Sequence, residues 1–209
     1  DFDHGNAVVY NSKEKRFYVS TGTGDKGDRE NGIEQRKMIA FEVKNNSIVP
    51  TGNEYPLGSY LNKHNTEYVA SGVVYNSDNN RYIVQNAQPW TDDRMFDIYT
   101  AFNSKPTTSY ITTYHQHPFG YIGQSTYLFA KNGVKYLGFI YMTIEHVDSF
   151  NDKNYRGHVD IYKVSNMSYV GTQDFPLIDE EIESASVYAG KLYIGFSKDH
   201  KANLYEATY

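Results

Sequence analysis

Val8-Val9-Tyr10-Asn11-Ser12 and Arg16-Phe17-Tyr18-Val19 decide how this chain folds, because both stretches return later with nearly the same residues. The later copies are Val73-Val74-Tyr75-Asn76-Ser77 and Arg81-Tyr82-Ile83-Val84, at an offset of 65 residues (from 8 to 73 and from 16 to 81). An alternating apolar run, a polar turn and a second alternating run predict a β-hairpin. A hairpin that recurs at a long fixed spacing indicates a repeat architecture.

The repeat extends over the whole chain. We place four units at about residues 1–58, 59–116, 117–177 and 178–209. The predicted strands are 7–11, 16–21, 37–43 and 47–52; 71–76, 81–85, 96–102 and 109–114; 124–130, 135–142, 158–164 and 168–174; and 184–188, 191–196 and 202–209. The third strands share a second motif, which reads Asp97-Ile98-Tyr99, Asp160-Ile161-Tyr162 and Asn203-Leu204-Tyr205.

Four strands in about 60 residues fits a β-propeller, whose blades are four-stranded sheets set around an axis. We predict an all-β propeller that forms a single domain over residues 1–209 and has four or five blades when closed. A β-sandwich is the alternative fold, but it does not require the same hairpin at a 65-residue spacing.

The last unit contains three predicted strands, which leaves an unpaired sheet edge. We expect residues upstream of Asp1, or another segment, to supply the missing strand. The chain opens on Asp1 without an initiator methionine or a signal peptide, so we expect a processed chain, an excised domain or a fragment.

Composition narrows the classes of partner. The net charge of −5 disfavours a nucleic-acid surface, where a basic stripe is expected. The chain has no cysteine, and no window approaches the roughly 20 apolar residues needed to span a membrane. Its 21 tyrosines fit half-buried strands and also supply amphipathic rings for binding.

Long polar loops between second and third strands carry the first candidate site. Trp90, the only tryptophan, lies next to Asp92, Asp93 and Arg94. A flat ring can cover the apolar face of a sugar while charged groups bind its hydroxyls, and this mixture of apolar wall and few polar anchors is typical of small-ligand sites. The alternative is that Trp90 fills the space between two blades.

A second loop rich in charged and polar residues is predicted over residues 145–157, with Tyr155 as the binding candidate. Asp148 and Asp152 could supply oxygen ligands to Ca²⁺. No EF-hand pattern accompanies them, and a solvated acidic loop is the other interpretation. We leave the metal open and expect no cofactor.

His4 and His117 enter inner strands and are candidates for an axial site, since histidine binds metals and ligands. Aligning the repeats places Asn6, Ser71, Ser125 and Ser184 in one ring around the axis. A water-filled channel is the alternative to an axial ligand.

Catalysis would require a selected pair of carboxylates, as in most glycoside hydrolysis. The candidates are Asp3, Glu67, Asp92, Glu145 and Glu183, and the sequence does not select two of them. No nucleophile elbow, phosphate loop or metalloprotease motif is present, so the sequence favours binding over catalysis.

The stretch from His4-Gly5-Asn6 through Ser12, followed by Arg16-Phe17-Tyr18-Val19, resembles the blade openings of bacterial and phage propellers. The assembly is similar to the propeller platform of receptor-binding tail proteins of phages that infect Gram-positive bacteria, which bind surface glycans. It is also similar in outline to five-bladed arabinanase-like glycosidases, where His-Asp-Pro is typical at a blade start. Asp3-His4-Gly5 reverses that order and lacks the proline, so no catalytic residue is carried over.

These observations give one leading hypothesis and two alternatives. We expect a carbohydrate- or cell-surface-binding propeller, extracellular or on a virion, that recognises a bacterial surface polysaccharide through its loop-rich face. Other subunits of a larger assembly are the remaining expected partners, with no nucleic acid and no membrane span. A glycan-cleaving enzyme on the same scaffold and a structural or protein-interaction propeller are the alternatives.

Overall fold

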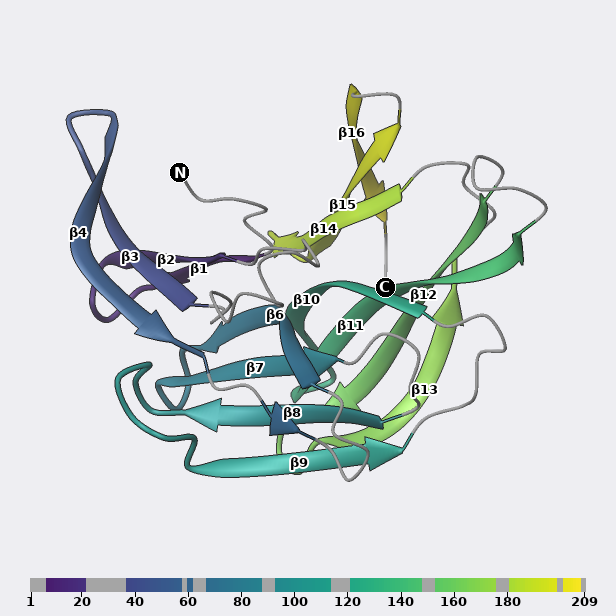
Figure 1. The fold of residues 1–209 in the computed structure, drawn as a ribbon, viewed down its shortest axis with the longest axis horizontal. Coiled ribbons are helices and arrows are strands. Elements are labelled where there is room, and N and C mark those ends of the chain that lie inside the picture. The colour runs from purple at the N-terminus through teal and green to yellow at the C-terminus, as the bar shows by residue number, and fades with distance from the viewer. Residues whose placement is uncertain are drawn as a thin grey trace. The chain divides into compact units, whose positions relative to one another are not determined.

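The computed structural model of the chain describes residues 7–21, 37–57, 60–61, 67–87, 93–113, 121–147, 153–175, 181–198 and 201–207. Within these ranges the chain forms antiparallel β-sheets, in each of which the strands follow one another in chain order (Figure 1). The predicted all-β fold with four-stranded blades is confirmed, and within the described residues the sheets have four, five, four and three strands in chain order.

The chain divides into two compact units, one comprising Asp1–Asn86 with Phe96–Ser109 and the other Ala87–Met95 with Tyr110–Tyr209. The first unit holds the first sheet and most of the second. Its strands are β1 (Ala7–Asn11), β2 (Arg16–Thr21), β3 (Lys37–Lys44) and β4 (Ser47–Pro56), then β5 (Tyr60–Leu61), β6 (Glu67–Asn76), β7 (Arg81–Ala87), β8 (Asp93–Tyr99) and β9 (Thr108–Thr113). β1 and β2 lie where the repeat predicted them, whereas β5 was not predicted.

The second unit holds the third and fourth sheets. Their strands are β10 (Tyr121–Lys131), β11 (Val134–Val147), β12 (Lys153–Lys163) and β13 (Ser168–Asp174), followed by β14 (Glu181–Tyr188), β15 (Lys191–Lys198) and β16 (Lys201–Ala207). The inner strands β10 and β14 each carry a register shift, between Gly123 and Ser125 and between Ile182 and Ser184. The Ala185 amide donates to the Ser125 hydroxyl at 3.2 Å, which joins these two inner strands.

The turn residues adopt the conformations that their chemistry permits. Asn45 and Asn46 have φ of 50° and 61°, and Asn132 and Gly133 have 51° and 75°. Asparagine and glycine tolerate the positive φ that tight hairpin turns require. The predicted turns at these two positions are therefore confirmed, and the structure agrees with the same prediction at Ala189 and Gly190.

The repeat is visible in the packing of side chains across the first hairpin of each of the first two sheets. The rings of Tyr10 and Phe17 lie 4.7 Å apart between centroids, and those of Tyr75 and Tyr82, their counterparts 65 residues later, lie 5.2 Å apart. The core of the first unit combines both sheets, with Val9, Tyr18, Met38 and Ala40 packed against Val73, Tyr82, Val84 and Tyr99.

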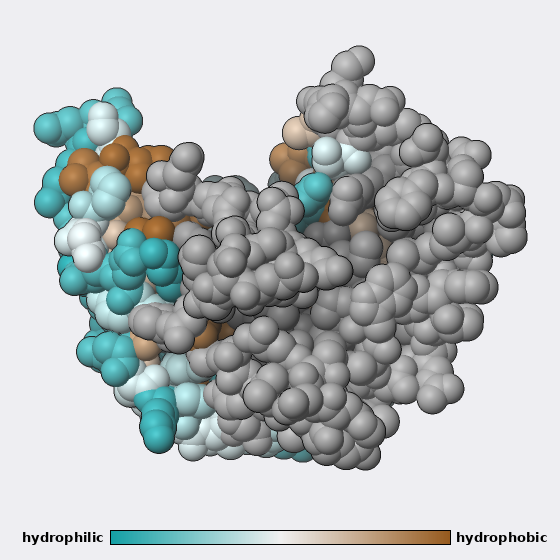
Figure 2. Space-filling view, viewed as in Figure 1, coloured by the Kyte–Doolittle hydropathy of each residue, from teal (hydrophilic) through white to brown (hydrophobic). Residues whose placement is uncertain are grey.

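The first sheet buries one face and exposes the other. Val73 is 3% exposed because the first sheet covers it, whereas its repeat counterpart Val8 is 63% exposed. Val43 and Ile48, a register pair on the β3–β4 hairpin, are exposed as well. Figure 2 shows apolar surface over this hairpin, at the upper left of the view.

Two predicted loops are shorter than expected, because their strands extend beyond the apolar runs. β11 continues to Val147 and β12 begins at Lys153, so Tyr155 is a strand residue paired with Ile144 and not a loop residue. Asp93 and Arg94 likewise belong to β8. Backbone pairing with the neighbouring strand continues through polar residues, which the hydrophobic pattern alone assigns to loops.

β8 ends three residues before its predicted end. Tyr99 is its last residue, and Phe102 lies in the turn before β9 instead of in a strand. Hydrogen bonds from the Thr107 amide to the Ile98 carbonyl (2.6 Å) and from the Ser104 amide to the Ala101 carbonyl (3.2 Å) hold this turn. The turn directs the Phe102 ring into the core of the first unit.

Gly138 provides a test of packing in the third sheet. A Cβ at this position would lie 2.3 Å from Cζ of Tyr127, its register partner on β10. Gly138→Ala should therefore lower the free energy of unfolding by about 1–3 kcal/mol, as overpacking does. Gly171→Ala in β13, where a Cβ meets nothing within 4 Å, is the matched control and should change stability by less than about 0.5 kcal/mol. Urea denaturation followed by circular dichroism measures both, and equal effects would contradict this account.

Candidate functional site: an aromatic cavity in the first unit

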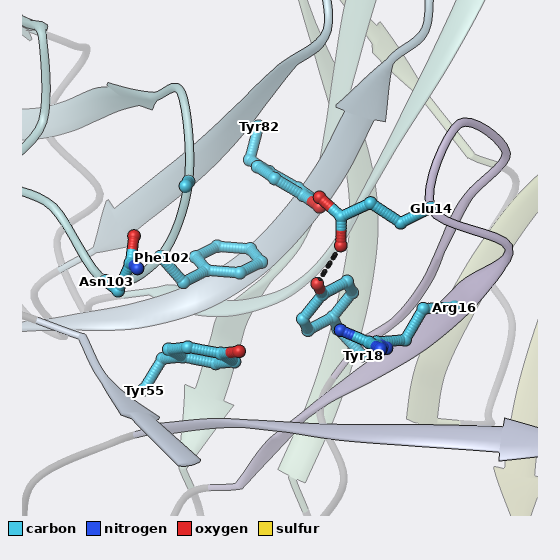
Figure 3. Close-up of a pocket in the computed structure, with 8 residues that line it drawn as sticks. Glu14, Arg16, Tyr18, Tyr55, Tyr82, Phe102 and Asn103 are labelled. Carbon is cyan, nitrogen blue, oxygen red and sulfur yellow. Dashed lines mark hydrogen bonds between the residues drawn. The ribbon is translucent and has the colours of Figure 1, made fainter. Parts of the chain in front are cut away.

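A cavity of about 130 Å³ lies in the first unit, among residues from both of its sheets. Its walls come from the β1–β2 turn, from β2, β4 and β7, and from the β8–β9 turn (Figure 3). The lining residues are Glu14, Arg16, Tyr18, Tyr55, Tyr82, Ala101, Phe102 and Asn103.

Four aromatic rings form the apolar wall. The centroid of the Tyr18 ring lies 5.3 Å from that of Phe102, 5.7 Å from that of Tyr82 and 6.1 Å from that of Tyr55. The Phe102 and Tyr82 rings are 4.1 Å apart. Centroid separations of 4.5–7 Å with tilted planes are the favoured arrangement for aromatic pairs, so most of this cluster is close to an aromatic packing optimum.

A bulge in β4 brings Tyr55 to the cavity. The register of β3 and β4 shifts between Ile39 and Phe41, and Gly52 in the bulged segment has φ of 80°. Glycine adopts this conformation without steric penalty. Pairing resumes beyond the bulge, with Met38 opposite Tyr55, and carries β4 past residue 52, where it was predicted to end.

Asn11 fixes the turn that carries Glu14. Its side-chain oxygen accepts hydrogen bonds from the backbone amides of Lys13 (2.9 Å) and Glu14 (3.0 Å), as in an Asx turn. Its side-chain nitrogen donates to the Tyr82 hydroxyl at 2.6 Å. Asn11 is fully buried, so the turn and the second sheet are joined by an amide with partners at both ends.

The polar groups of the cavity are a carboxylate and phenol hydroxyls. The Tyr18 hydroxyl donates to the Glu14 carboxylate, as the dashed line in Figure 3 marks. Burial, and then the hydrogen bond to Glu14, raise the pKa of Tyr18 well above its ordinary value. Burial also raises the pKa of Tyr82. Both phenols therefore remain protonated at neutral pH and can donate hydrogen bonds.

Arg16 brings a cation to the wall of the cavity. Its Nη2 lies 3.4 Å from Oε1 of Glu42, and Nζ of Lys44 lies 2.7 Å from Oε2 of the same carboxylate. Lys44 and then Arg16 lower the pKa of Glu42, which keeps it ionised. Nε of Arg16 is buried and has no hydrogen-bond partner among the described residues.

The arrangement suits recognition more than hydrolysis. Among the described residues that line the cavity, Glu14 is the only carboxylate, whereas glycoside hydrolysis generally uses two carboxyl groups within about 5–10 Å of each other. Aromatic walls with a carboxylate, a guanidinium and hydroxyls form a typical small-ligand environment.

The roles proposed from sequence for seven residues stay predictions. His4, Trp90, Asp92 and His117 fall outside the described residues. Asp93, Arg94 and Tyr155 are described only as strand positions, in β8 and β12, so the structure tests none of the seven roles.

The other candidates are divided between described and undescribed residues in the same way. Asp3 and Asn6, with Asp148 and Asp152 of the proposed Ca²⁺ loop, are outside the described residues, while Ser125 and Ser184 lie on the inner strands β10 and β14. In the described ranges, no group of three or more His, Asp or Glu side chains could hold a metal ion. In the same part of the chain, no helix is long and apolar enough to cross a membrane.

This cavity was not predicted from the sequence, although two of its aromatic residues lie in the recurring hairpins. Tyr18 and Tyr82 belong to the recurring hairpins, but Tyr18 corresponds to Ile83 and Tyr82 to Phe17 in the other copy. The signal is thus a difference between repeats and not a shared motif.

Comparison with known proteins supports the fold. No protein-family model matches the chain, and no curated protein matches its sequence. Among solved structures it is similar to a neuraminidase-like protein from A/bat/Guatemala/164/2009, with a TM-score of 0.51 and 8% identity over 97% of this chain and 50% of that one. It is also similar to a subtype N11 neuraminidase-like protein of A/flat-faced bat/Peru/033/2010, with a TM-score of 0.48 and 13% identity over 97% of this chain and 48% of that one.

The β-propeller domain of the Trilobed protease from Pyrococcus furiosus is also similar, with a TM-score of 0.36 and 9% identity over 96% of this chain and 65% of that one. This chain spans about half the length of the neuraminidase-like chains. The chain has the β-propeller fold. Identities this low show the fold alone.

A double-mutant cycle tests the link between Asn11 and Tyr82. Asn11→Ala should lower the free energy of unfolding by about 1–3 kcal/mol and Tyr82→Phe by about 1 kcal/mol, since each removes a partner from a buried hydrogen bond. The double variant should be less destabilised than the sum by about 1 kcal/mol. Strict additivity in urea denaturation would show that the two side chains do not interact.

Alkaline pH tests the environment of Tyr18. A tyrosine whose pKa is higher in the folded state contributes full stability below the unfolded value of about 10. That contribution is lost as the pH rises from 10 toward the folded pKa, by up to about 1.4 kcal/mol for each pH unit. Between pH 9 and pH 11 the urea midpoint of Tyr18→Phe should therefore fall less than that of the wild type. The exposed Tyr188 provides the control, because Tyr188→Phe removes no buried phenol. An identical fall in Tyr18→Phe and wild type would contradict the prediction.

Proposed function

We propose that this propeller is a carbohydrate-recognition module that binds a bacterial surface glycan. The observation that carries the proposal is the cavity itself, in which Tyr55 and Phe102 stand beside Glu14 and Arg16. A ring face covers the apolar C–H face of a sugar, and charged groups bind its hydroxyls. This is the same combination that the sequence offered at Trp90, Asp92, Asp93 and Arg94, built here from described residues.

Two features of the wall support a hydroxyl-bearing ligand. The Arg16 guanidinium belongs to the lining of the cavity, and the N–H groups of a guanidinium can donate to the hydroxyl oxygens of a sugar. The Glu14 carboxylate has acceptor capacity beyond the one bond from Tyr18, and a second hydroxyl can donate to it.

The site of action in this proposal is outside the cell, on a cell surface or a virion. The module would serve as one subunit of a larger assembly that attaches to wall polysaccharide, in line with the resemblance of its blade openings to phage tail platforms. Glycan recognition of this kind requires no cofactor, because side chains make all of the contacts. A glycan-cleaving activity has less support, because the described residues supply one carboxylate to the cavity and most glycoside hydrolysis uses two.

Binding of the purified chain to intact Gram-positive cells and to extracted wall polysaccharide tests this function. We expect saturable binding that leaves the molecular mass of the polymer unchanged. Tyr55→Ala should weaken binding at least tenfold, because the contact between the sugar and this half-buried part of the wall depends on the Tyr55 ring. Tyr169→Ala, at an exposed tyrosine of β13, is the matched control and should bind as the wild type does.

The other outcomes are informative. Shortened polymer would identify an enzyme. Loss of binding in Trp90→Ala, with Tyr55→Ala unaffected and folded by near-UV circular dichroism, would move the glycan site to the 88–94 segment. The absence of any binding to cells and polysaccharide would overturn the proposed function.

A further inference from the structure

The charges around the cavity are unequally compensated. Arg16 and Lys44 both contact the Glu42 carboxylate, at 3.4 Å and 2.7 Å. The Glu14 carboxylate accepts a hydrogen bond from the neutral Tyr18 hydroxyl, and no Lys or Arg of the described residues forms an ion pair with it within 4 Å. Among the described residues, Glu14 is therefore the ionised group of the cavity lining that has no ion-pair partner within 4 Å.

The Glu14 carboxylate would attract a positively charged ligand group, and the aromatic rings next to it favour a positive charge as well. Tyr18, Tyr55 and Phe102 form a triangle with centroids 5.3, 6.1 and 6.4 Å apart. The face of an aromatic ring carries negative potential and attracts a cation within about 6 Å of its centroid. Figure 3 shows Glu14 on the same side of the cavity as the Tyr18 hydroxyl, with the Tyr55 and Phe102 rings across from it.

The spacing of these rings also limits the size of the cation. A methylated ammonium held between two ring faces needs two carbon–carbon contacts of about 3.5–4.0 Å each, or centroids at least about 7 Å apart. All three separations in the triangle are shorter than this. A primary ammonium is smaller, and its three donors can bond the Glu14 carboxylate and the phenol oxygens together.

From this geometry we propose that the cavity is a subsite for a sugar bearing a free primary amine, with Glu14 as the counter-ion of its ammonium group. The inference rests on the proposed glycan-binding function and specifies which sugar residue the cavity takes. It assigns Glu14 to selection between charged and neutral sugars, and the Tyr55 and Phe102 rings to the apolar face that such sugars share.

The test compares D-glucosamine with D-glucose and N-acetyl-D-glucosamine. The three sugars differ only in the substituent at carbon 2, which is an ammonium group in glucosamine and is neutral in the other two. NMR chemical-shift titration of the full chain gives the dissociation constants. We expect glucosamine to bind at least tenfold more tightly than either neutral sugar. Glu14→Gln keeps the shape and an acceptor for Tyr18 but removes the charge, so glucosamine should lose its tenfold advantage over the two neutral sugars.

Glu54→Gln is the matched control. Glu54 is an exposed carboxylate of the same sheet, paired with Lys37 at 2.5 Å and absent from the cavity wall, so its removal should leave the glucosamine preference intact. Equal binding of the three sugars, or a preference that survives Glu14→Gln, would overturn the inference.

The polysaccharide assay separates this inference from the function on which it rests. Polysaccharide binding that depends on Tyr55, without any preference for glucosamine, would overturn the amine subsite and leave the glycan-binding proposal standing. A glucosamine preference that depends on Glu14, in a chain that binds no wall polysaccharide, would support the subsite and overturn the proposed function.

Discussion

The buried side-chain amide of Asn11 is the interaction on which the first unit depends. One end of the amide closes the β1–β2 turn through the Lys13 and Glu14 backbone, and the other end binds the hydroxyl of Tyr82 on the second sheet. A fully buried amide requires partners at both ends, so the conformation of the turn and the position of Tyr82 are set together. Glu14 and the aromatic wall of the cavity owe their relative positions to this one group.

The chemistry of the cavity follows from how its polar groups are held. Burial raises the pKa of the Tyr18 and Tyr82 hydroxyls, and the Glu42 carboxylate pairs with both Arg16 and Lys44. Among the described residues, the wall therefore combines hydrogen-bond donors, one carboxylate without an ion-pair partner and the faces of four rings. In the function proposed above, such a surface would recognise its ligand by contact and charge.

The fold was predictable where local chemistry decides the structure, and the site was not. Asn45-Asn46 and Asn132-Gly133 predict their turns because these residues tolerate positive φ, and the 65-residue offset predicts paired hairpins. Strand ends were placed wrongly at Asp93 and Tyr155, since backbone pairing continues through polar residues that a hydrophobic pattern assigns to loops. The cavity draws its residues from segments between 14 and 103, which meet only through packing of the two sheets, and Tyr55 and Phe102 belong to no repeated motif.

The side chains that make the cavity are not repeated along with the hairpin that carries them. Sixty-five residues after Glu14, Arg16 and Tyr18 stand Asn79, Arg81 and Ile83, so the second copy keeps the guanidinium but has neither the carboxylate nor the phenol. With these side chains the two hairpins build this cavity once, so a chain that binds glycan as proposed would be monovalent toward a polymer through it. Firm attachment to a polymer of weakly bound sugars would then come from avidity, in which several chains held side by side raise the overall affinity by about 10²–10⁴. In the proposed function, valency would thus be a property of the assembly, and each chain would set which sugar is selected.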